Sequence, residues 1–204
     1  VVTFNDCEFK ATTQVKAAIE IDGSKGSSYT VNINNCTESG FAKGANTGLS
    51  LFNVEGAENV TVVVDGNTWL GNGLYENENG DKVAYSEAPY VIGSVVLGGP
   101  VAIYGDATAQ GAQPTIQGGL KIGADVTSVH LEALTFDGAG LADYPHNLTF
   151  DAAAKVESIT VVNCKLNNYL RGVLYENSMA PTVGFIKYDG VEVNNVTGDG
   201  GDCF

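Results

Sequence analysis

Basic residues are scarce in this sequence, and arginine occurs only once, as Arg171. Ten lysine and arginine residues stand against 24 aspartate and glutamate residues, which gives a formal net charge of −14. Nucleic-acid binding depends on clustered basic side chains that displace counterions, so we expect no nucleic-acid partner. A chain of this charge also repels acidic polysaccharides unless a divalent cation lies between the two.

Long apolar runs and helix-forming stretches are missing as well. No apolar run approaches the roughly 18 residues that cross a bilayer, so we expect no membrane insertion. Stretches rich in alanine and leucine are absent, whereas the chain has 26 glycines and many valines and threonines. This composition predicts short strands separated by many turns.

A short strand-and-corner motif recurs along the chain. In residues 156–166, Ile159 and Val161 alternate toward one face, Asn163 interrupts the alternation, and Cys164 and Leu166 return to that face. Asparagine tolerates the left-handed backbone conformation that a bend between two short strands needs. Copies of the motif recur 26 to 30 residues apart, except for one interval of 39 residues.

The motif positions predict a ladder of corner residues that stack on one another. In five of the seven copies an Asn or Asp is followed by a Cys or Gly, and Gly66 and Gly190 take the cysteine's place. The expected ladder consists of Asp6, Asn35, Asp65, Asn163 and Asp189, with Cys7, Cys36 and Cys164 beside them. Cys7 and Cys36 then lie close enough for a disulfide, although a stack of small buried thiols suits the position better.

A period of this length is the signature of a solenoid. A leucine-rich repeat would put two residues between its second apolar strand position and the asparagine, and a helix would follow the asparagine. Here only one residue intervenes, and no helix-forming stretch follows. We therefore predict an all-β, right-handed parallel β-helix with about seven coils and three short strands per coil. Residues 1–66 would form the first coils, 67–95 an irregular acidic loop or seam, and 96–204 a second segment that continues the stack.

Three phrases carry a resemblance to a known fold family: residues 3–9, 31–36 and 161–166. They resemble the pectate-lyase-like β-helix superfamily. More narrowly, residues 118–204, with Asn168-Tyr169-Leu170-Arg171-Gly172, are similar to uncharacterised β-helical domains of secreted and surface proteins from gut bacteria. The resemblance implies an extracellular or cell-surface location. It specifies fold better than activity, because the same coil serves lyases, hydrolases, adhesins and phage fibres.

Catalytic constellations are weak in the sequence. A lyase of the pectate type needs a carboxylate cluster for Ca²⁺ and an arginine base, and Arg171 has no paired acids near it in one coil. Asp199 and Asp202 faintly resemble the acid pair of polygalacturonase-type hydrolases, but two glycines separate them. We expect turn residues there, or a weak Ca²⁺ site, and no other cofactor. His130 points outward between two apolar residues and has no second metal ligand nearby.

Aromatic residues near the single arginine form the candidate carbohydrate-binding set. Tyr169, Arg171, Tyr175 and Tyr188 fall on successive expected strands, although tyrosine rings also cap the edges of coils. The sequence therefore favours a non-catalytic extracellular module with a structural, adhesive or assembly role. Its expected partners are a glycan, or another copy of the chain stacked against open ends of the coil. The alternative is a polysaccharide lyase or glycoside hydrolase.

Overall fold

The computed structural model describes residues 1–15, 19–22, 28–41, 52–55, 60–70, 74–76, 78–84, 90–92, 94–105, 113–117, 119–139, 147–169, 174–175 and 182–196. Every regular element in these segments is a β-strand, and all but one of the strand pairs are parallel. The prediction of an all-β parallel solenoid is therefore confirmed, with about four turns. The same segments contain no helix that is long and apolar enough to cross a membrane.

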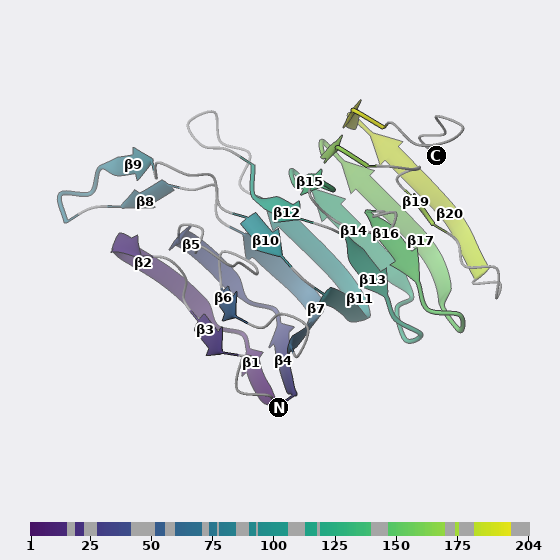
Figure 1. Cartoon of the computed structure of the whole chain (residues 1–204), viewed down its shortest axis with the longest axis horizontal. Helices are drawn as coiled ribbons and strands as arrows, with labels where there is room; N and C mark the ends of the chain where they lie inside the picture. The colour runs from purple at the N-terminus through teal and green to yellow at the C-terminus, as the bar shows by residue number, and fades with distance from the viewer. Residues whose placement is uncertain are drawn as a thin grey trace.

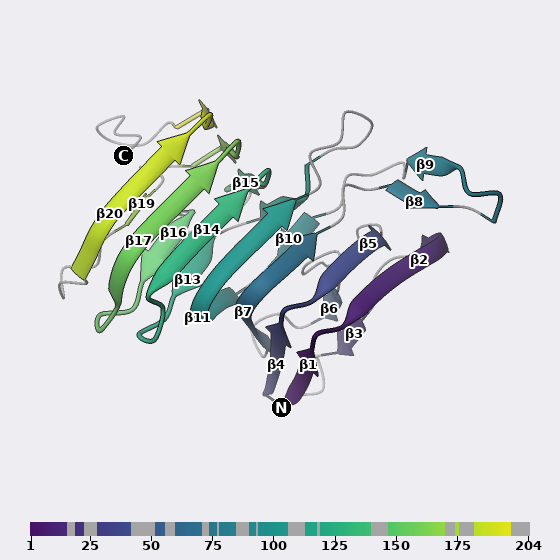
Figure 2. The ribbon, with the colours of Figure 1, turned by 180° about the vertical axis from the view of Figure 1, so that it is seen from behind.

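One long sheet runs through the molecule and joins strands that are far apart in sequence (Figure 1). Each of its main strands pairs in parallel with the corresponding strand of the next repeat. Their order is β1 (Val2–Asn5), β4 (Tyr29–Asn34), β7 (Val60–Leu70), β11 (Ser94–Gly105), β14 (Ser128–Glu132), β17 (Lys155–Val162) and β20 (Thr182–Asp189). Seen from behind, these strands form a row of arrows that point the same way, with β1 and β20 at opposite ends (Figure 2).

Shorter strands form the other sides of the coils. Within the long sheet, β2 (Glu8–Val15) pairs with β5 (Thr37–Phe41), and β13 (Leu120–Ile122), β16 (Leu148–Phe150) and β19 (Leu174–Tyr175) continue from β11. A second parallel sheet consists of β10 (Tyr90–Ile92), β12 (Thr115–Gln117), β15 (Thr135–Asp137), β18 (Lys165–Asn167) and β21 (Glu192–Asn194). Two smaller pairs are parallel β3 (Ile19–Asp22) with β6 (Phe52–Glu55), and antiparallel β8 (Leu74–Glu76) with β9 (Lys82–Ala84).

The segment 67–95, expected to be an irregular loop or seam, has strands at both ends. Residues 67–70 belong to β7 and residues 94–95 belong to β11. These two strands pair over two stretches, with a shift in register between Leu97 and Val101. The β8–β9 hairpin comes between them in sequence and lies beside β2 and β5. The long sheet therefore passes through this part of the chain without a break.

The core follows from the alternation of apolar and polar residues in the strands. In β14, Val129 and Leu131 are at most 2% exposed, whereas His130 between them is only half-buried. Their register partners Ile159 and Val161 in β17 are fully buried as well. Each such side chain stabilises the fold by roughly 1.5–3 kcal/mol on leaving water, so the stacked inward columns hold successive coils together.

The bends between strands occur at residues with positive φ, as the asparagine motif predicts. They include Asp6, Asn35, Ala133, Asn163, Asn168 and Asn195, together with Gly66 and Gly190. The predicted alignment of the two glycines is wrong by one residue. Register pairs Asn34 with Asp65 and Val162 with Asp189, so Gly66 is the equivalent of Asn35, and Gly190 of Asn163.

The physical reason lies in the corner of the preceding coil. A Cβ built on Gly66 would clash with Oδ1 of Asn35, and one on Gly190 would clash with Oδ1 of Asn163. Only glycine fits where the amide of the coil below fills this space. Asp65 and Asp189 are therefore the last strand residues before the corner, and Gly66 and Gly190 do not occupy the cysteine position.

The corners also lie in more than one column, where the sequence predicted one. Asp6, Asn35 and Gly66 follow β1 and β4 and their continuation in β7, whereas Ala133, Asn163 and Gly190 follow β14, β17 and β20. Strand β11 separates the two columns, because Gly66 pairs with Val101, while Gly105 pairs with Leu70. Gly105 lies against Ala133, so it belongs to the second column.

A third corner follows the second sheet and is held by a ladder of amides. Asn168 donates a hydrogen bond from Nδ2 to Oδ1 of Asp137 at 2.8 Å, and accepts one from Nδ2 of Asn195 at 3.1 Å. One residue earlier, Asn194 donates to Oδ1 of Asn167 at 3.0 Å. The sequence motif gave no sign of this corner, because no cysteine or alternating run marks it.

The three cysteines in the described residues pack as free thiols behind corners of the first two columns, and Cys203 lies outside the described residues. Cys36 and Cys164 are fully buried, and Cys7 is half-buried. Each buried thiol donates to a carbonyl oxygen two residues earlier, Asn34 at 3.4 Å and Val162 at 3.3 Å. Burial raises the pKa of Cys36, and raises that of Cys164 to about 11. A compact, weakly polar side chain suits this position.

Candidate functional site

Two of the predicted carbohydrate-binding residues, Tyr169 and Tyr188, have rings that point into the solenoid. Tyr169 is 0% exposed, and burial raises its pKa well above the usual range for tyrosine. Tyr188 pairs with the fully buried Val161, so its ring lies in an inward column, and burial raises its pKa to about 12. A sugar needs an accessible ring face, which the fully buried Tyr169 does not offer.

The other predicted site residues are only partly placed. Arg171, Asp199 and Asp202 lie outside the described residues, so the proposed base and the weak Ca²⁺ site stay predictions. Tyr175 contributes its backbone to β19, where it pairs with Thr149. Within the described segments, no three His, Cys, Asp or Glu side chains are placed to share a metal ion.

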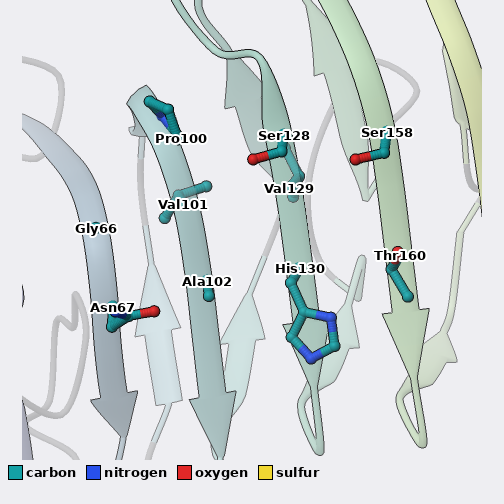
Figure 3. Close-up of a pocket in the computed structure, with 10 residues that line it drawn as sticks. All are labelled: Gly66, Asn67, Pro100, Val101, Ala102, Ser128, Val129, His130, Ser158 and Thr160. Atoms are coloured by element: carbon teal, nitrogen blue, oxygen red, sulfur yellow. The ribbon is translucent and has the colours of Figure 1, made fainter.

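A shallow groove crosses the outer face of the long sheet instead. It has a volume of about 360 Å³ and extends over four neighbouring strands, β7, β11, β14 and β17 (Figure 3). The residues that line it are Gly66, Asn67, Pro100, Val101, Ala102, Ser128, Val129, His130, Ser158 and Thr160. None of these side chains is an acid, a lysine or an arginine, so the lining is neutral apart from the titratable imidazole.

Strand register explains why these residues meet. Asn67 pairs with Ala102, Ala102 with His130 and His130 with Thr160, so one outward row runs straight across the four strands. Ser128 and Ser158 pair with each other two residues earlier and start a second row. In Figure 3 both serine hydroxyls point toward the preceding strand, and the Asn67 amide points toward β11.

The imidazole of His130 is fixed by two neighbours beside the groove. Its Nε2 lies 3.0 Å from Oε2 of Glu132, two residues along the same strand. Its ring centroid lies 5.3 Å from that of Tyr104 in β11, with the planes tilted by 45°. The side chains of His130 and Glu132 are 32% and 41% exposed. Solvent therefore reaches a ring, an imidazole and a carboxylate at one edge of the groove.

This arrangement offers hydrogen-bonding groups to a ligand. The lining supplies an amide, three hydroxyls and an imidazole, which donate and accept hydrogen bonds. Glycoside hydrolysis uses two carboxyl groups on either side of the scissile bond. Beside the groove, Glu132 lies 3.0 Å from the imidazole of His130, and Asp65 accepts a hydrogen bond from the backbone N–H of Gly66.

Sequence reasoning placed His130 on the outer face, as the structure confirms, but did not find the groove. A signal was present: Ser128 and Ser158, and likewise His130 and Thr160, are 30 residues apart at outward positions. Short polar side chains that repeat at the period of the coil predict a polar stripe on one face. Asn67 gave no such signal, because it falls in the segment assigned to a loop.

Comparison with known proteins leaves the family open. No protein-family model matches the chain, and no curated protein or solved structure is significantly similar to it. What the structure supports is the coarser conclusion, namely that this chain is a parallel β-solenoid.

Proposed function

We propose that this chain is a non-catalytic extracellular module, in which a stiff β-solenoid acts as a structural and adhesive element. The observation that carries the proposal is the uninterrupted parallel pairing from β1 to β20 through β7 and β11. Each coil is bound to the next by backbone hydrogen bonds and a shared apolar column. Such an array resists bending and presents its outer face over a long distance.

The alternative, a polysaccharide lyase or glycoside hydrolase, gains less support from the groove. Its lining has no carboxylate; beside it, Glu132 lies 3.0 Å from the imidazole of His130, and Asp65 accepts a hydrogen bond from the backbone N–H of Gly66. A catalytic groove of either type would bring together at least two carboxylates, or a Ca²⁺ cluster and a basic residue. The neutral lining instead favours binding without turnover.

We also propose the winding direction and the number of coils of the solenoid. Right-handed winding is expected, because crossovers between parallel strands have that hand in nearly all proteins. The structure shows about four turns, and the recurring corner motif supports the finer proposals of about seven coils and membership of the pectate-lyase-like superfamily. End-to-end stacking of copies is also part of the proposal, and sedimentation velocity over a range of protein concentrations tests it.

An activity screen separates the module from the enzyme. The intact chain is incubated with neutral and acidic polysaccharides, with and without added Ca²⁺, and assayed for new reducing ends and unsaturated products. We expect neither product on any substrate, while small-angle scattering gives the elongated profile of a rod. Release of either product in proportion to the amount of protein would overturn the proposal in favour of the enzyme.

A further inference from the structure

We propose that the outer-face groove is a binding site for a linear, uncharged polysaccharide that lies across the strands, parallel to the direction in which the coils stack. The inference rests on the proposed function in one respect, namely that the bound chain is held and not cleaved. It assigns a ligand class to residues that the sequence had not connected, centred on Asn67, Ala102, His130 and Thr160.

The shape of the groove favours an extended polymer. Its outward row takes one residue from each of the four strands, from Asn67 on β7 to Thr160 on β17. Neighbouring strands lie about 4.8 Å apart, which is close to the length of one sugar unit in an extended chain. In a polymer lying along the row, each sugar would therefore contact a new polar or small side chain. Figure 3 shows these side chains on neighbouring strands.

The chemistry of the lining favours hydroxyl-rich ligands. Hydroxyls of Ser128, Ser158 and Thr160 and the amide of Asn67 both donate and accept hydrogen bonds, which matches sugar hydroxyls. Pro100 is exposed and Ala102 is half-buried, and both offer apolar contact to the C–H face of a sugar ring. Binding pockets commonly combine apolar surface with a few placed polar groups in this way.

Charge decides between uncharged and acidic polysaccharides. The chain carries a formal net charge of −14, and Glu132 lies at the edge of the groove. A polyanion would be repelled by this field and would find no lysine or arginine in the lining. A polycation would be attracted to the molecule as a whole, but it would find no carboxylate in the lining either. An uncharged polymer avoids both mismatches.

Affinity electrophoresis tests the inference with the intact chain. The protein is run in native gels that contain mixed-linkage β-glucan, xyloglucan or galactomannan, and polygalacturonate serves as the charged comparison. We expect at least one neutral polymer to retard the protein, and polygalacturonate to retard it less. Failure of all the neutral polymers to retard it, or stronger retardation by polygalacturonate, would overturn the inference.

Two matched variants locate the binding. Ala102→Arg fills the floor of the groove, whereas Thr149→Arg adds the same charge and bulk at an outward position of β16 away from it. We expect Ala102→Arg to weaken binding about tenfold or more and Thr149→Arg to change it less than about twofold, since buried contact sites dominate affinity. Equal retardation of the two variants would overturn the inference.

A second pair of changes guards against misfolding of the arginine variant. Ser128→Ala with Ser158→Ala removes two hydroxyls and little volume, so the fold should be preserved, as circular dichroism can verify. We expect a measurable loss of retardation, and unchanged retardation would count against the site. These outcomes are read from binding alone, whereas the proposed function fails only if the activity screen finds products, so the two failures are distinguishable.

Discussion

The first coils and the later coils use the same corner motif at different places on the coil. In the first coils, β1 ends at Asn5 and β2 begins at Glu8, so a single left-handed residue, Asp6, starts the bend between them. In the later coils, β13 ends at Ile122 and β14 begins at Ser128, and residues 123–127 fill the gap. The left-handed corner has moved to the far end of β14, where Ala133 leads into β15.

This difference shows what the Asn-Cys motif encodes. At Asn35 and at Asn163, a left-handed residue ends a strand and a buried cysteine follows. These features depend on neighbouring residues alone, so the motif works at either corner. Its position around the coil depends on how many residues separate one strand from the next. At this corner the later coils have more residues between strands, and they also hold the second sheet.

The largest contrast between the two regions should appear in core stability. Phe136 in the second sheet is 0% exposed, whereas Phe4 in β1 is only half-buried and makes an edge contact with Phe9 at 5.7 Å. We expect Phe136→Ala to lower the free energy of unfolding by about 3–5 kcal/mol, and Phe4→Ala by about 1–2 kcal/mol. Urea denaturation followed by circular dichroism measures both.

The comparison between regions fails if these two losses are equal. Equal values would mean that the first coil is as well packed as the later ones. A change in the denaturant slope in either variant would also matter, because it would show that the first coils unfold separately from the rest.

The next contrast concerns the corner glycines. Gly66 has φ of 65°, and a Cβ there would clash with Oδ1 of Asn35. Gly80, in the turn between β8 and β9, has φ of 82°, and nothing lies within 4 Å of its Cβ position. Alanine should cost about 1–2 kcal/mol at Gly80 from backbone strain alone. At Gly66 the clash adds to that strain, so we expect roughly 2–4 kcal/mol.

Thermal denaturation of Gly66→Ala and Gly80→Ala, each alone and each combined with Asn35→Gly, measures the clash. Removing the amide at position 35 should recover part of the loss at position 66 and none of the loss at position 80. A double variant no more stable than Gly66→Ala would show that the Asn35 side chain is not what restricts this corner.

A smaller effect is expected at the third corner, which follows the second sheet in the later coils. Asn168, with φ of 60°, forms two amide hydrogen bonds to the corners on either side of it. We expect Asn168→Ala to cost about 2–3 kcal/mol, because it loses the hydrogen bonds and strains the backbone. Asn168→Gly keeps the backbone relaxed, so it should cost about 1 kcal/mol. Chemical denaturation of both variants separates the two contributions.

The sequence predicts the strands and the corner chemistry well, because both are local. Alternation placed Val129, Leu131, Ile159 and Val161 inside and His130 outside, as the structure confirms. The asparagine rule identified Asn35 and Asn163 as corners. The prediction of a parallel solenoid needed only these features and their regular spacing.

What the sequence could not give depends on register between coils. The one-residue offset at Gly66 and Gly190 follows from a clash with the coil below, which no single repeat reveals. Tyr169 was expected outside, but it follows the left-handed Asn168, and the chain turns it into the core. The groove joins four strands through pairings such as Ala102 with His130, so it exists only once the coils are stacked.

The smallest contrast is a pH effect on the buried thiol of the later coils. Burial raises the pKa of Cys164 to about 11 from an ordinary value of 9.0. The folded state therefore keeps this proton where the unfolded chain releases it. The stabilisation is complete below about pH 9 and is lost as pH rises toward 11, by roughly 1 kcal/mol at pH 10. Cys7 follows the corner of the first coil in the same sequence motif and is half-buried, so it serves as the comparison.

Urea midpoints at pH 7.5 and pH 10 test this for the parent chain and for Cys164→Ala and Cys7→Ala. The parent and Cys7→Ala should lose stability between the two pH values through Cys164, Cys36 and the buried tyrosines, whose pKa values burial raises. Cys164→Ala should lose less, because the unfolded chain no longer gains by releasing that proton. An equal loss in all three proteins would mean that water reaches the Cys164 thiol as readily as it reaches the half-buried Cys7.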